Sequence, residues 1–191
     1  DSQKSESRSG QAKTLRRERT VRDPRLETLE NRTLLSTAGP LFPGQEFDVG
    51  RQPNWIAAGD FNDDGVDDLA TANQISDTVS VLFGNGNGTF QPPLDIEVGN
   101  LPDSVSAGDL NGDGITDLVS ANLFGDSVSV LLSAGDGSFQ SQVETAVGDL
   151  PPAVAIGDLN GDGIADLATA NAASECVSVF FELGDGSFQS E

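Results

Sequence analysis

Short runs of apolar residues alternate with turn-forming residues along most of the chain. One such run begins at Trp55, and others begin at Leu69, Thr78 and Phe90. Within the runs, β-branched and other apolar residues recur at every second position, which is typical of strands. No comparable stretch has the three-to-four-residue spacing of an amphipathic helix. The pattern therefore predicts an all-β protein.

The order of these runs repeats with a period of 49 residues. Three groups of residues share that period, and they are Asp60, Asp109 and Asp158; Phe90, Phe139 and Phe188; and Val49, Val98 and Val147. A period of this length indicates a repeat architecture. The repeats cover approximately residues 42–90, 91–139 and 140–191.

Four strand-like runs in each repeat predict a four-stranded β-propeller blade. A sheet this small cannot bury its faces alone, so the three blades are expected to stack on one another. Closed propellers use about four to eight blades. We therefore expect a partial or fragmentary propeller, with further blades supplied by a longer parent chain. Residues 47–50 (Phe-Asp-Val-Gly) match the end of a fourth strand and are expected to supply a missing partner.

Charge divides the chain near residue 38. Residues 1–38 carry a net charge of +3 and residues 39–191 carry −24, within a total of −21. The basic segment has the low-complexity composition of a largely disordered tail, with a short helix expected through Leu26 and Leu29. The acidic part is rich in Val, Leu and Ile, so we expect it to fold and to need cations. Its charge excludes nucleic acid as a partner.

The residue inventory excludes further classes of protein. The chain has no histidine, which rules out Ser-His-Asp catalysis and histidine-based zinc sites. Cys176 is the only cysteine, so no disulfide forms within the chain, and we expect it to be a small buried residue in a strand. No apolar run approaches the roughly 20 residues of a transmembrane helix.

An aspartate-rich loop lies between the first two strands of each repeat. Counted from its first aspartate, the loop has oxygen-bearing side chains at positions 1, 3, 5 and 9 and glycine at position 6 (Gly65, Gly114 and Gly163). Position 7 would add a backbone carbonyl while its side chain packs inward. The predicted metal ligands are Asp60, Asn62, Asp64, Val66 and Asp68; Asp109, Asn111, Asp113, Ile115 and Asp117; and Asp158, Asn160, Asp162, Ile164 and Asp166.

Hard oxygen donors of this number favour Ca²⁺, about three ions in all, over Mg²⁺ or Mn²⁺. The loop is not an EF-hand, because position 12 is Thr71, Ser120 or Thr169 instead of glutamate and the flanking runs are strands. One alternative remains, in which the aspartates only form turns between strands. Asp63 and Asp67 occur in the first loop alone and are expected to be solvated.

These motifs resemble a known repeat family. The sequence Asp-x-Asn-x-Asp-Gly-x-x-Asp-Leu, followed by Ser-Val-Ser-Val and Gly-Asp-Gly-Ser-Phe, is similar to the FG-GAP/VCBS-type repeat, whose blades also build the integrin α-subunit propeller. The resemblance covers residues 42–191. It implies calcium held in the acidic loops, an extracellular location, and a role in adhesion or in binding proteins or carbohydrates. A ring of this type usually has about seven blades, so the copy number here departs from the family.

The N-terminal segment has three interpretations. The arginine-rich run followed by Leu26-Glu and Arg32-Thr-Leu-Leu-Ser36 resembles the leader of planctomycete-type bacterial surface proteins. That leader would direct the chain out of the cell, to be secreted or displayed on the surface. The second interpretation is a flexible tail without a targeting role. The third is a basic arm that binds nucleic acid or a membrane.

The sequence favours a binding module over an enzyme. The carboxylates that could act in acid–base catalysis are those that the loop spacing assigns to metal, and three equal sites suggest a structural role. The leading hypothesis is a calcium-binding extracellular module for adhesion or for protein or carbohydrate binding. Its ligand-contacting connections would be residues 73–77, 122–126 and 171–175, which we expect to be exposed. Alternatives are a non-catalytic accessory propeller of a larger secreted enzyme and a structural spacer.

Overall fold

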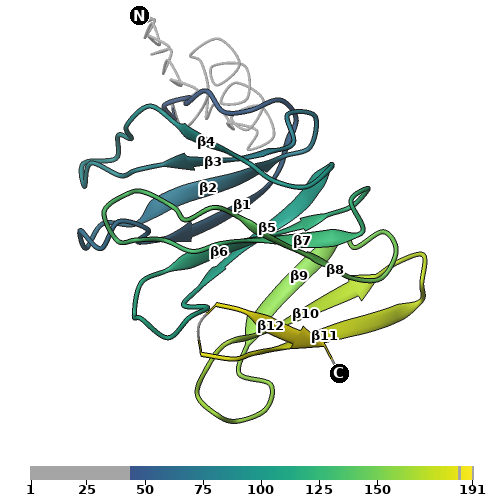
Figure 1. The fold of residues 1–191 in the computed structure, drawn as a ribbon. Coiled ribbons are helices and arrows are strands. Elements are labelled where there is room, and N and C mark those ends of the chain that lie inside the picture. Colours follow the sequence, from purple (N-terminus) through teal and green to yellow (C-terminus); the bar gives the residue numbers. More distant parts are fainter. Residues whose placement is uncertain (1–43, 185, 191) are drawn as a thin grey trace, which may run out of the picture. The chain divides into compact units, whose positions relative to one another are not determined.

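The computed structural model describes residues 44–184 and 186–190, which form three four-stranded antiparallel sheets (Figure 1). No helix occurs in these residues. Blade 1 contains β1 (Pro53–Gly59), β2 (Asp68–Asn73), β3 (Thr78–Leu82) and β4 (Leu94–Glu97). Blade 2 contains β5 (Pro102–Gly108), β6 (Asp117–Asn122), β7 (Ser127–Leu131) and β8 (Val143–Ala146). Blade 3 contains β9 (Ala153–Gly157), β10 (Asp166–Asn171), β11 (Cys176–Glu182) and β12 (Phe188–Ser190).

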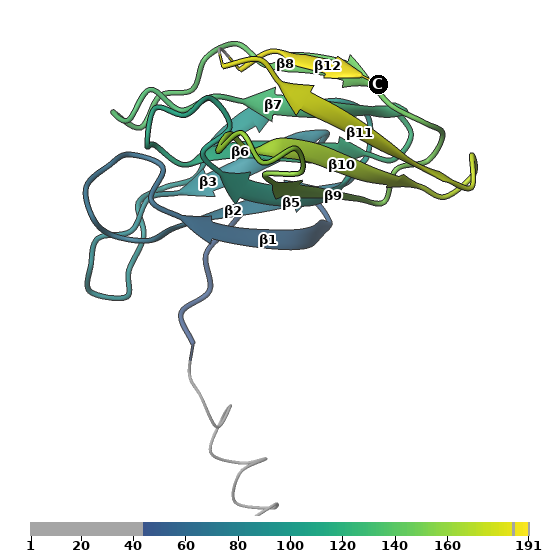
Figure 2. The same ribbon diagram turned by 90° about the horizontal axis from the view of Figure 1, so that it is seen from below.

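Within every blade the strands lie side by side in chain order, as in a propeller blade. The register is the same throughout, because the second and third strands pair Leu69 with Leu82, Leu118 with Leu131, and Leu167 with Phe180. The first strands β1, β5 and β9 lie next to one another at one edge of the stack (Figure 2). The predicted all-β class and the four-stranded blades are thus confirmed.

The hydrophobic core lies between blades rather than within one. One buried cluster joins the faces of blades 1 and 2, and it includes Phe61, Val79, Val105 and Leu118. A second cluster joins blades 2 and 3 and includes Leu110, Val128, Val154 and Leu167. Since each blade contributes one face to each neighbour, stacking supplies the burial that a single sheet lacks.

A polar network lies at the end of the second strand of each blade. In blade 2, Asn122 Nδ2 donates to Ser127 Oγ at 3.0 Å and to Ser129 Oγ at 2.9 Å, while Ser120 Oγ donates to Asn122 Oδ1 at 3.0 Å. All four side chains are buried. Asn73 and Asn171 sit at the same position with equivalent partners. The network holds the turn between the second and third strands of each blade. Its polar atoms are paired, so the buried asparagine amide is not left unsatisfied.

The segments that lead into each blade close over this network. Gly99 N donates to Ser129 Oγ at 3.1 Å, and Gly50 N donates to Ser80 Oγ at the same distance. A Cβ atom on Gly50 would lie 2.6 Å from the Asn73 amide nitrogen, so only glycine allows this approach. The segment that contains Gly50 therefore contacts blade 1 in the same way as the linker between blades 1 and 2, which contains Gly99, contacts blade 2.

Some sequence-based expectations need correction. Cys176 is exposed instead of buried, because it lies on β11, where no further blade covers it. The connections expected to be exposed begin with a buried asparagine, Asn73, Asn122 or Asn171, since the network requires it. The run from Phe90 makes only an isolated bridge before β4 begins at Leu94. Residues 47–50 are not in a strand of the structure.

The predictions for the basic segment and its short helix lie outside the described residues. The chain divides into two units, Asp1–Gly44 and Gln45–Glu191, and the three blades form the second. The part of the chain that is described holds no helix long and apolar enough to cross a membrane.

Replacement of the buried asparagine tests the network. Asn122→Ala removes three hydrogen bonds and leaves the buried hydroxyl of Ser120 without its acceptor, so we expect a loss of about 2–4 kcal/mol in the free energy of unfolding. Chemical denaturation monitored by circular dichroism measures it. The control Asn100→Ala changes an exposed asparagine and should stay within about 0.5 kcal/mol. Equal stability of the two variants would contradict the assigned role.

Candidate metal centres

The three acidic loops lie between the first and second strands, at positions 60–67, 109–116 and 158–165. Since the strands are antiparallel, the glycine turns between the third and fourth strands lie at the same end of each blade. A Cβ atom on Gly135 would be 2.8 Å from Ile115 Cδ1 and 3.8 Å from Asp63 Cβ. Each glycine turn thus lies against the loop of its own blade, and the turn of blade 2 also lies near the loop of blade 1.

The loop of blade 2 turns its side-chain oxygens back toward its own main chain. Asp109 Oδ1 accepts from Gly112 N at 2.7 Å and from Asp113 N at 3.2 Å, and Asp109 Oδ2 accepts from Gly114 N at 2.9 Å. Asn111 Oδ1 accepts from Asp113 N at 3.0 Å. Asp113 Oδ1 accepts from Ile115 N at 2.8 Å. Positions 1, 3 and 5 therefore direct their oxygens into one small loop.

The other two loops repeat this arrangement. The position-5 amide lies 3.2 Å from Oδ1 of the position-1 aspartate in all three blades. The position-3 asparagine donates from Nδ2 to the position-5 carboxylate at 2.8 to 3.0 Å. The three loops, which share one sequence pattern, therefore share one geometry.

The position-9 aspartate is fully buried, unlike the others. Asp117 Oδ2 accepts from Leu110 N at 2.9 Å, and its Oδ1 accepts from Ser133 N at 2.7 Å. Asp68 and Asp166 bind the equivalent amides. This carboxylate joins the start of the loop to the residue that follows the third strand. It therefore holds the loop in a fixed position on the blade.

Burial, more than any other factor, raises the pKa of Asp117, to about 6. The hydrogen bonds from Leu110 and Ser133 lower this pKa, whereas the charges of Asp113 and Asp109 raise it. The pKa of Asp68 is likewise raised, mainly by burial and also by Asp64 and Asp60. The carboxylates of a loop are thus close enough to repel one another, and a cation would relieve that repulsion.

The side chain at position 7 is half-buried in each loop and lies against the glycine turn of its own blade. The methyl groups of Val66 contact the turn that contains Gly84 and Gly86, and Ile115 packs on Gly135. Gly114 at position 6 has a φ of 87°, in the region that glycine reaches without strain. These two positions keep the loop tight while its oxygens converge.

The residues present fit a hard divalent cation. Each carboxylate has about four acceptor sites, so the hydrogen bonds to main-chain amides leave sites open. In the described residues, no group of three histidine, cysteine or acidic side chains is close enough to form a metal cluster by itself. A cation would therefore need the asparagine oxygen and the position-7 carbonyl in addition to the aspartates. All these donors are hard oxygens of the type that Ca²⁺ uses.

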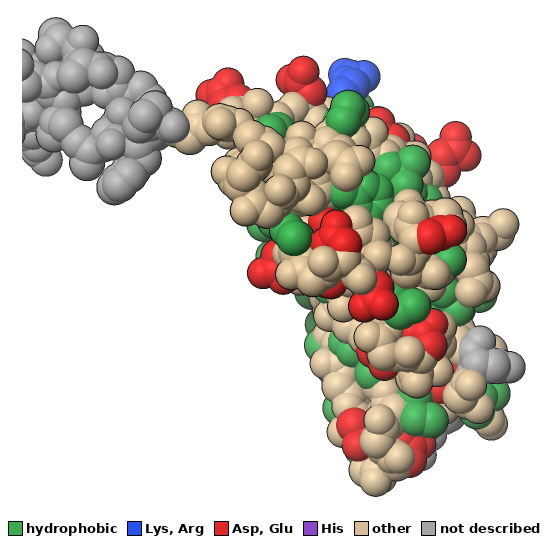
Figure 3. Space-filling model, turned by 90° about the vertical axis from the view of Figure 1, so that its left-hand side faces the viewer, with side chains coloured by type: hydrophobic (Ala, Val, Ile, Leu, Met, Phe, Trp, Pro, Cys, Tyr) green, Lys and Arg blue, Asp and Glu red, His purple; other side chains and the backbone are tan. Residues whose placement is uncertain are grey.

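The surface around the loops is strongly acidic. Acidic side chains are spread over the face shown in Figure 3. Within residues 44–184 and 186–190, Arg51 is the only basic residue. The described residues therefore lack the lysine and arginine side chains that would neutralise the carboxylates of the three loops.

Two structural roles escaped the sequence analysis. The amide of Ser133 binds Asp117, and the Ser133 hydroxyl donates to the main-chain oxygen of Phe61 at 2.6 Å, which joins blade 2 to the loop of blade 1. Phe61 also contacts the ring of Phe139, with centroids 6.4 Å apart. The buried asparagines, Asn73, Asn122 and Asn171, share the 49-residue period, so this period could have revealed them.

Comparisons with known proteins identify the repeat. The family model for the FG-GAP-like repeat matches residues 60–120 and 109–169, which together are more than half of the chain. The chain therefore belongs to the FG-GAP-like repeat family, whose repeats are typical of extracellular β-propeller proteins. No curated protein matches the chain in sequence.

Among solved structures, one similar fold is a protein from Lactobacillus plantarum determined by structural genomics. The TM-score is 0.54 at 16% sequence identity, over 81% of this chain and 45% of that protein. The likeness supports the fold alone. The chain thus spans less than half the length of this relative.

The backbone of the first loop offers a stability test. Position 4 is Asp63 with a φ of 55°, whereas the other loops have Gly112 and Gly161 there. Asp63→Gly removes the left-handed strain, so we expect the free energy of unfolding to rise by about 0.5–1 kcal/mol. Thermal melts in chelator measure it.

The matched control for this test is Asp67→Gly. It removes the same charge at an exposed position whose φ is not positive, so it should lower stability. An equal gain in both variants would show that charge, not backbone strain, is responsible.

The raised pKa of Asp117 gives a pH prediction for the metal-free protein. Its folded pKa of about 6 exceeds the unfolded value of 3.8, so the folded state binds this proton more tightly. The contribution of Asp117 to stability therefore falls as pH rises from about 4 to about 6. Wild type should lose stability over this range relative to Asp117→Asn, as measured by melts in chelator. A constant difference between the two proteins would contradict the shift.

Proposed function

We propose that this chain is a calcium-binding extracellular module that binds a protein or carbohydrate partner. The observation that carries the proposal is the identical convergence of oxygens at positions 1, 3 and 5 of three loops, each held in place by a buried position-9 aspartate. A turn-forming role alone requires no such set, because one aspartate or asparagine suffices for an Asx turn.

Calcium suits these loops better than magnesium. Ca²⁺ accepts six to eight oxygen ligands in variable geometry, whereas Mg²⁺ demands a near-ideal octahedron and keeps its waters. The proposed ligands in blade 2 are Asp109, Asn111, Asp113, the carbonyl of Ile115, and Asp117. Blades 1 and 3 use the residues at the same positions. About three ions per chain follow from three loops.

Metal binding in these loops would stabilise the fold as well as the loop. An ion that binds only the folded chain adds RT ln(1 + [L]/Kd) to stability. Extracellular calcium modules bind at about 10⁻⁴–10⁻³ M. At about 10 mM calcium, each loop would then contribute roughly 1.4–2.7 kcal/mol.

The proposed role is binding rather than catalysis. Three equivalent loops, each with its carboxylates engaged by main-chain amides, support a structural use of the ion. The partner would bind at the opposite end of the blades, on the turns between second and third strands. Two of these turns present exposed apolar side chains, Ile75 and Phe124, which suit a binding surface.

The accessory role in a larger secreted enzyme is the second candidate. An extracellular setting suits both roles, because calcium there is high enough to occupy loops of this affinity.

Calcium titration by calorimetry, with melts in calcium and in chelator, tests the proposal. We expect uptake of about three ions and a marked rise in melting temperature. Asp113→Ala should lose about one ion and part of the thermal gain, since it removes one ligand and the acceptor for Ile115 N. The matched control Asp67→Ala removes an exposed carboxylate and should keep all three ions.

Two outcomes of the titration would contradict the proposal. No calcium uptake, with equal melting temperatures in calcium and chelator, would reduce the aspartates to turn formers. Loss of an ion in the Asp67→Ala control as well would show that net charge, not the ligand set, governs binding.

A further inference from the structure

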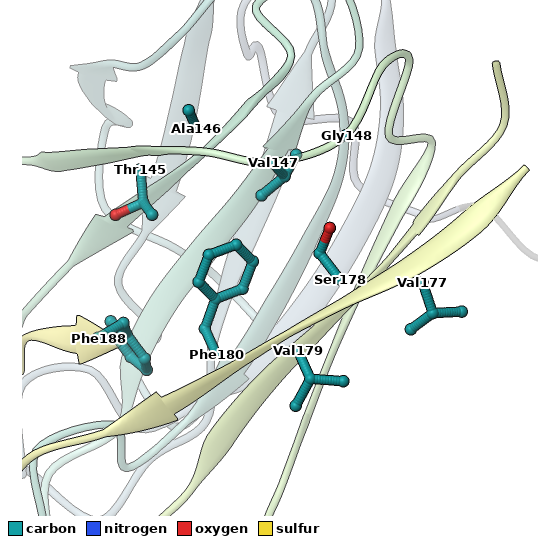
Figure 4. Close-up of a pocket in the computed structure, with 9 residues that line it drawn as sticks. All are labelled: Thr145, Ala146, Val147, Gly148, Val177, Ser178, Val179, Phe180 and Phe188. Atoms are coloured by element: carbon teal, nitrogen blue, oxygen red, sulfur yellow. The ribbon is translucent and has the colours of Figure 1, made fainter. Parts of the chain in front are cut away.

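The cavity that the end of β8, the following linker, β11 and β12 line offers no reactive side chain (Figure 4). It has a volume of about 520 Å³, and the ring of Phe180 and the side chain of Val147 point into it. The polar side chains of its lining are the hydroxyls of Thr145 and Ser178, with no amide or carboxylate side chain beside them in that lining. Reactive amides are found instead in the exposed turns at the ends of the blades.

Four asparagines in the sequence are followed directly by glycine. Such a pair is chemically labile, because the main-chain nitrogen of the glycine can attack the side-chain amide and no Cβ atom hinders the approach. Asparagine is accordingly one of the thermolabile residues. The four asparagines are Asn85 and Asn87 in the glycine turn of blade 1, and Asn111 and Asn160 in the acidic loops of blades 2 and 3.

The acidic loops bind the nitrogen that would attack. In blade 2, Gly112 N donates to Asp109 Oδ1 at 2.7 Å. In blade 3, Gly161 N donates to Asp158 Oδ1 at 2.6 Å. Attack requires this nitrogen to lose its proton, and a carboxylate that accepts its hydrogen bond disfavours the loss, both through the bond and through its negative charge. The position-1 aspartate therefore protects the asparagine of its loop.

The glycine turn of blade 1 has no such protection. It lies between β3 and β4 (Figure 1), and residues 85–88 are exposed. Among the described residues, Gly88 N has no hydrogen-bond partner. No heavy atom beyond its chain neighbours lies within 4 Å of the point where a Cβ atom on Gly88 would stand. The nitrogen is therefore open to water and to the adjacent side chain of Asn87.

Thr89 polarises the side-chain carbonyl of Asn87. Thr89 N donates to Asn87 Oδ1 at 3.0 Å, and Thr89 Oγ1 donates to the same oxygen at 2.7 Å. Two donors on one oxygen stabilise the negative charge that develops there when a nucleophile adds to the carbon, as an oxyanion hole does. Asn85 lacks this activation, because its Nδ2 donates to Thr89 Oγ1 at 2.9 Å and its Oδ1 accepts no bond from the described residues.

We propose that Asn87 is a site of self-catalysed deamidation. Gly88 N attacks Asn87 Cγ, and a new Cγ–N bond forms. The Cγ–Nδ2 bond then breaks, and the side-chain nitrogen leaves as ammonia with the proton that Gly88 N has lost. Water opens the resulting cyclic imide at either of its two C–N bonds, which leaves aspartate or isoaspartate at position 87.

The glycine turn of blade 2 shows that the fold accepts the aspartate product. It has Asp136 at the position 49 residues after Asn87. Asp136 Oδ1 accepts from Ser138 N at 2.9 Å and from Ser138 Oγ at 2.5 Å, which are the bonds that Thr89 makes to Asn87. Deamidation thus adds a negative charge where blade 2 already carries one. The reaction uses no metal ion, so this proposal and calcium binding can fail separately.

Storage of the 191-residue chain in chelator at mildly alkaline pH, followed by chymotryptic digestion and mass spectrometry, tests the proposal. Chymotrypsin cuts after phenylalanine and leucine, so residues 84–90, 111–118 and 160–167 are released as separate peptides. Storage in heavy-oxygen water labels the carboxylate that forms, and the label separates deamidation during storage from deamidation during the digest.

We expect Asn87 to deamidate at least about tenfold faster than Asn111 and Asn160 in the folded chain. Fragment ions should place the change at Asn87 and not at Asn85. Aspartate and isoaspartate should both appear, because the imide opens at either bond. In guanidinium chloride the chain unfolds and the hydrogen bonds of the loops and the turn are lost, so the four asparagines should deamidate at similar rates.

Two substitutions of Thr89 isolate the contribution of its hydroxyl. Thr89→Val keeps the main-chain donor and the β-branched shape but removes one hydrogen bond to Asn87 Oδ1, so the deamidation rate should fall by roughly fivefold. The matched control Thr89→Ser keeps the hydroxyl, as Ser138 does in blade 2, and should deamidate at close to the wild-type rate. Melts in the same buffer check that both variants are folded.

Several results would overturn the proposal. Deamidation of residues 84–90 no faster than that of the loop peptides would remove the protection by the position-1 aspartates. A difference that persists in guanidinium chloride would show that sequence alone explains it. Conversion of Asn85 ahead of Asn87, or an unchanged rate in Thr89→Val, would exclude activation by Thr89. Aspartate without isoaspartate would exclude the imide.

Discussion

The buried aspartate at position 9 of each loop is the interaction on which the rest of the blade depends. Through Asp117, the amide that opens the loop and the amide that follows β7 are bound by one carboxylate. A carboxylate without solvent is costly unless its oxygens are paired, so the two amides and the aspartate stabilise one another. The same contact positions the loop oxygens and places Ser133 against blade 1. Loop geometry and blade stacking are therefore linked through a single side chain.

Concentrated negative charge is the main constraint on this fold. The blades contain many carboxylates and, in the described residues, one arginine. The structure manages part of this charge by directing carboxylates toward main-chain amides, in both the loops and the glycine turns. Asp136 accepts from the amide and hydroxyl of Ser138, and the hydroxyl bond is the largest of the effects that lower its pKa. Amides offset charge only partly, and for that reason we favour a bound cation in the loops.

Repetition makes both ends of the stack informative. Each internal interface is built from residues at fixed positions of the 49-residue period, so an exposed position can be compared with its buried equivalents in the other blades. Val177 and Ile56 are exposed where their equivalents, Val128 and Val105, are buried. The comparison shows how much apolar surface one blade covers on the next.

The sequence by itself determined the all-β class, the four strands of each blade and the aspartate loops, because these depend on local periodicity and on glycine at fixed positions. Loop conformation is likewise local, since its hydrogen bonds join residues two to five positions apart. Only the tertiary structure decided that Asp117 is buried, that Asn122 forms a network and that Cys176 is exposed. Asp117 and Asn122 are held by partners elsewhere in their own blade. The exposure of Cys176 depends instead on which blade covers which face. A pattern within one repeat carries no information about the neighbour that covers it.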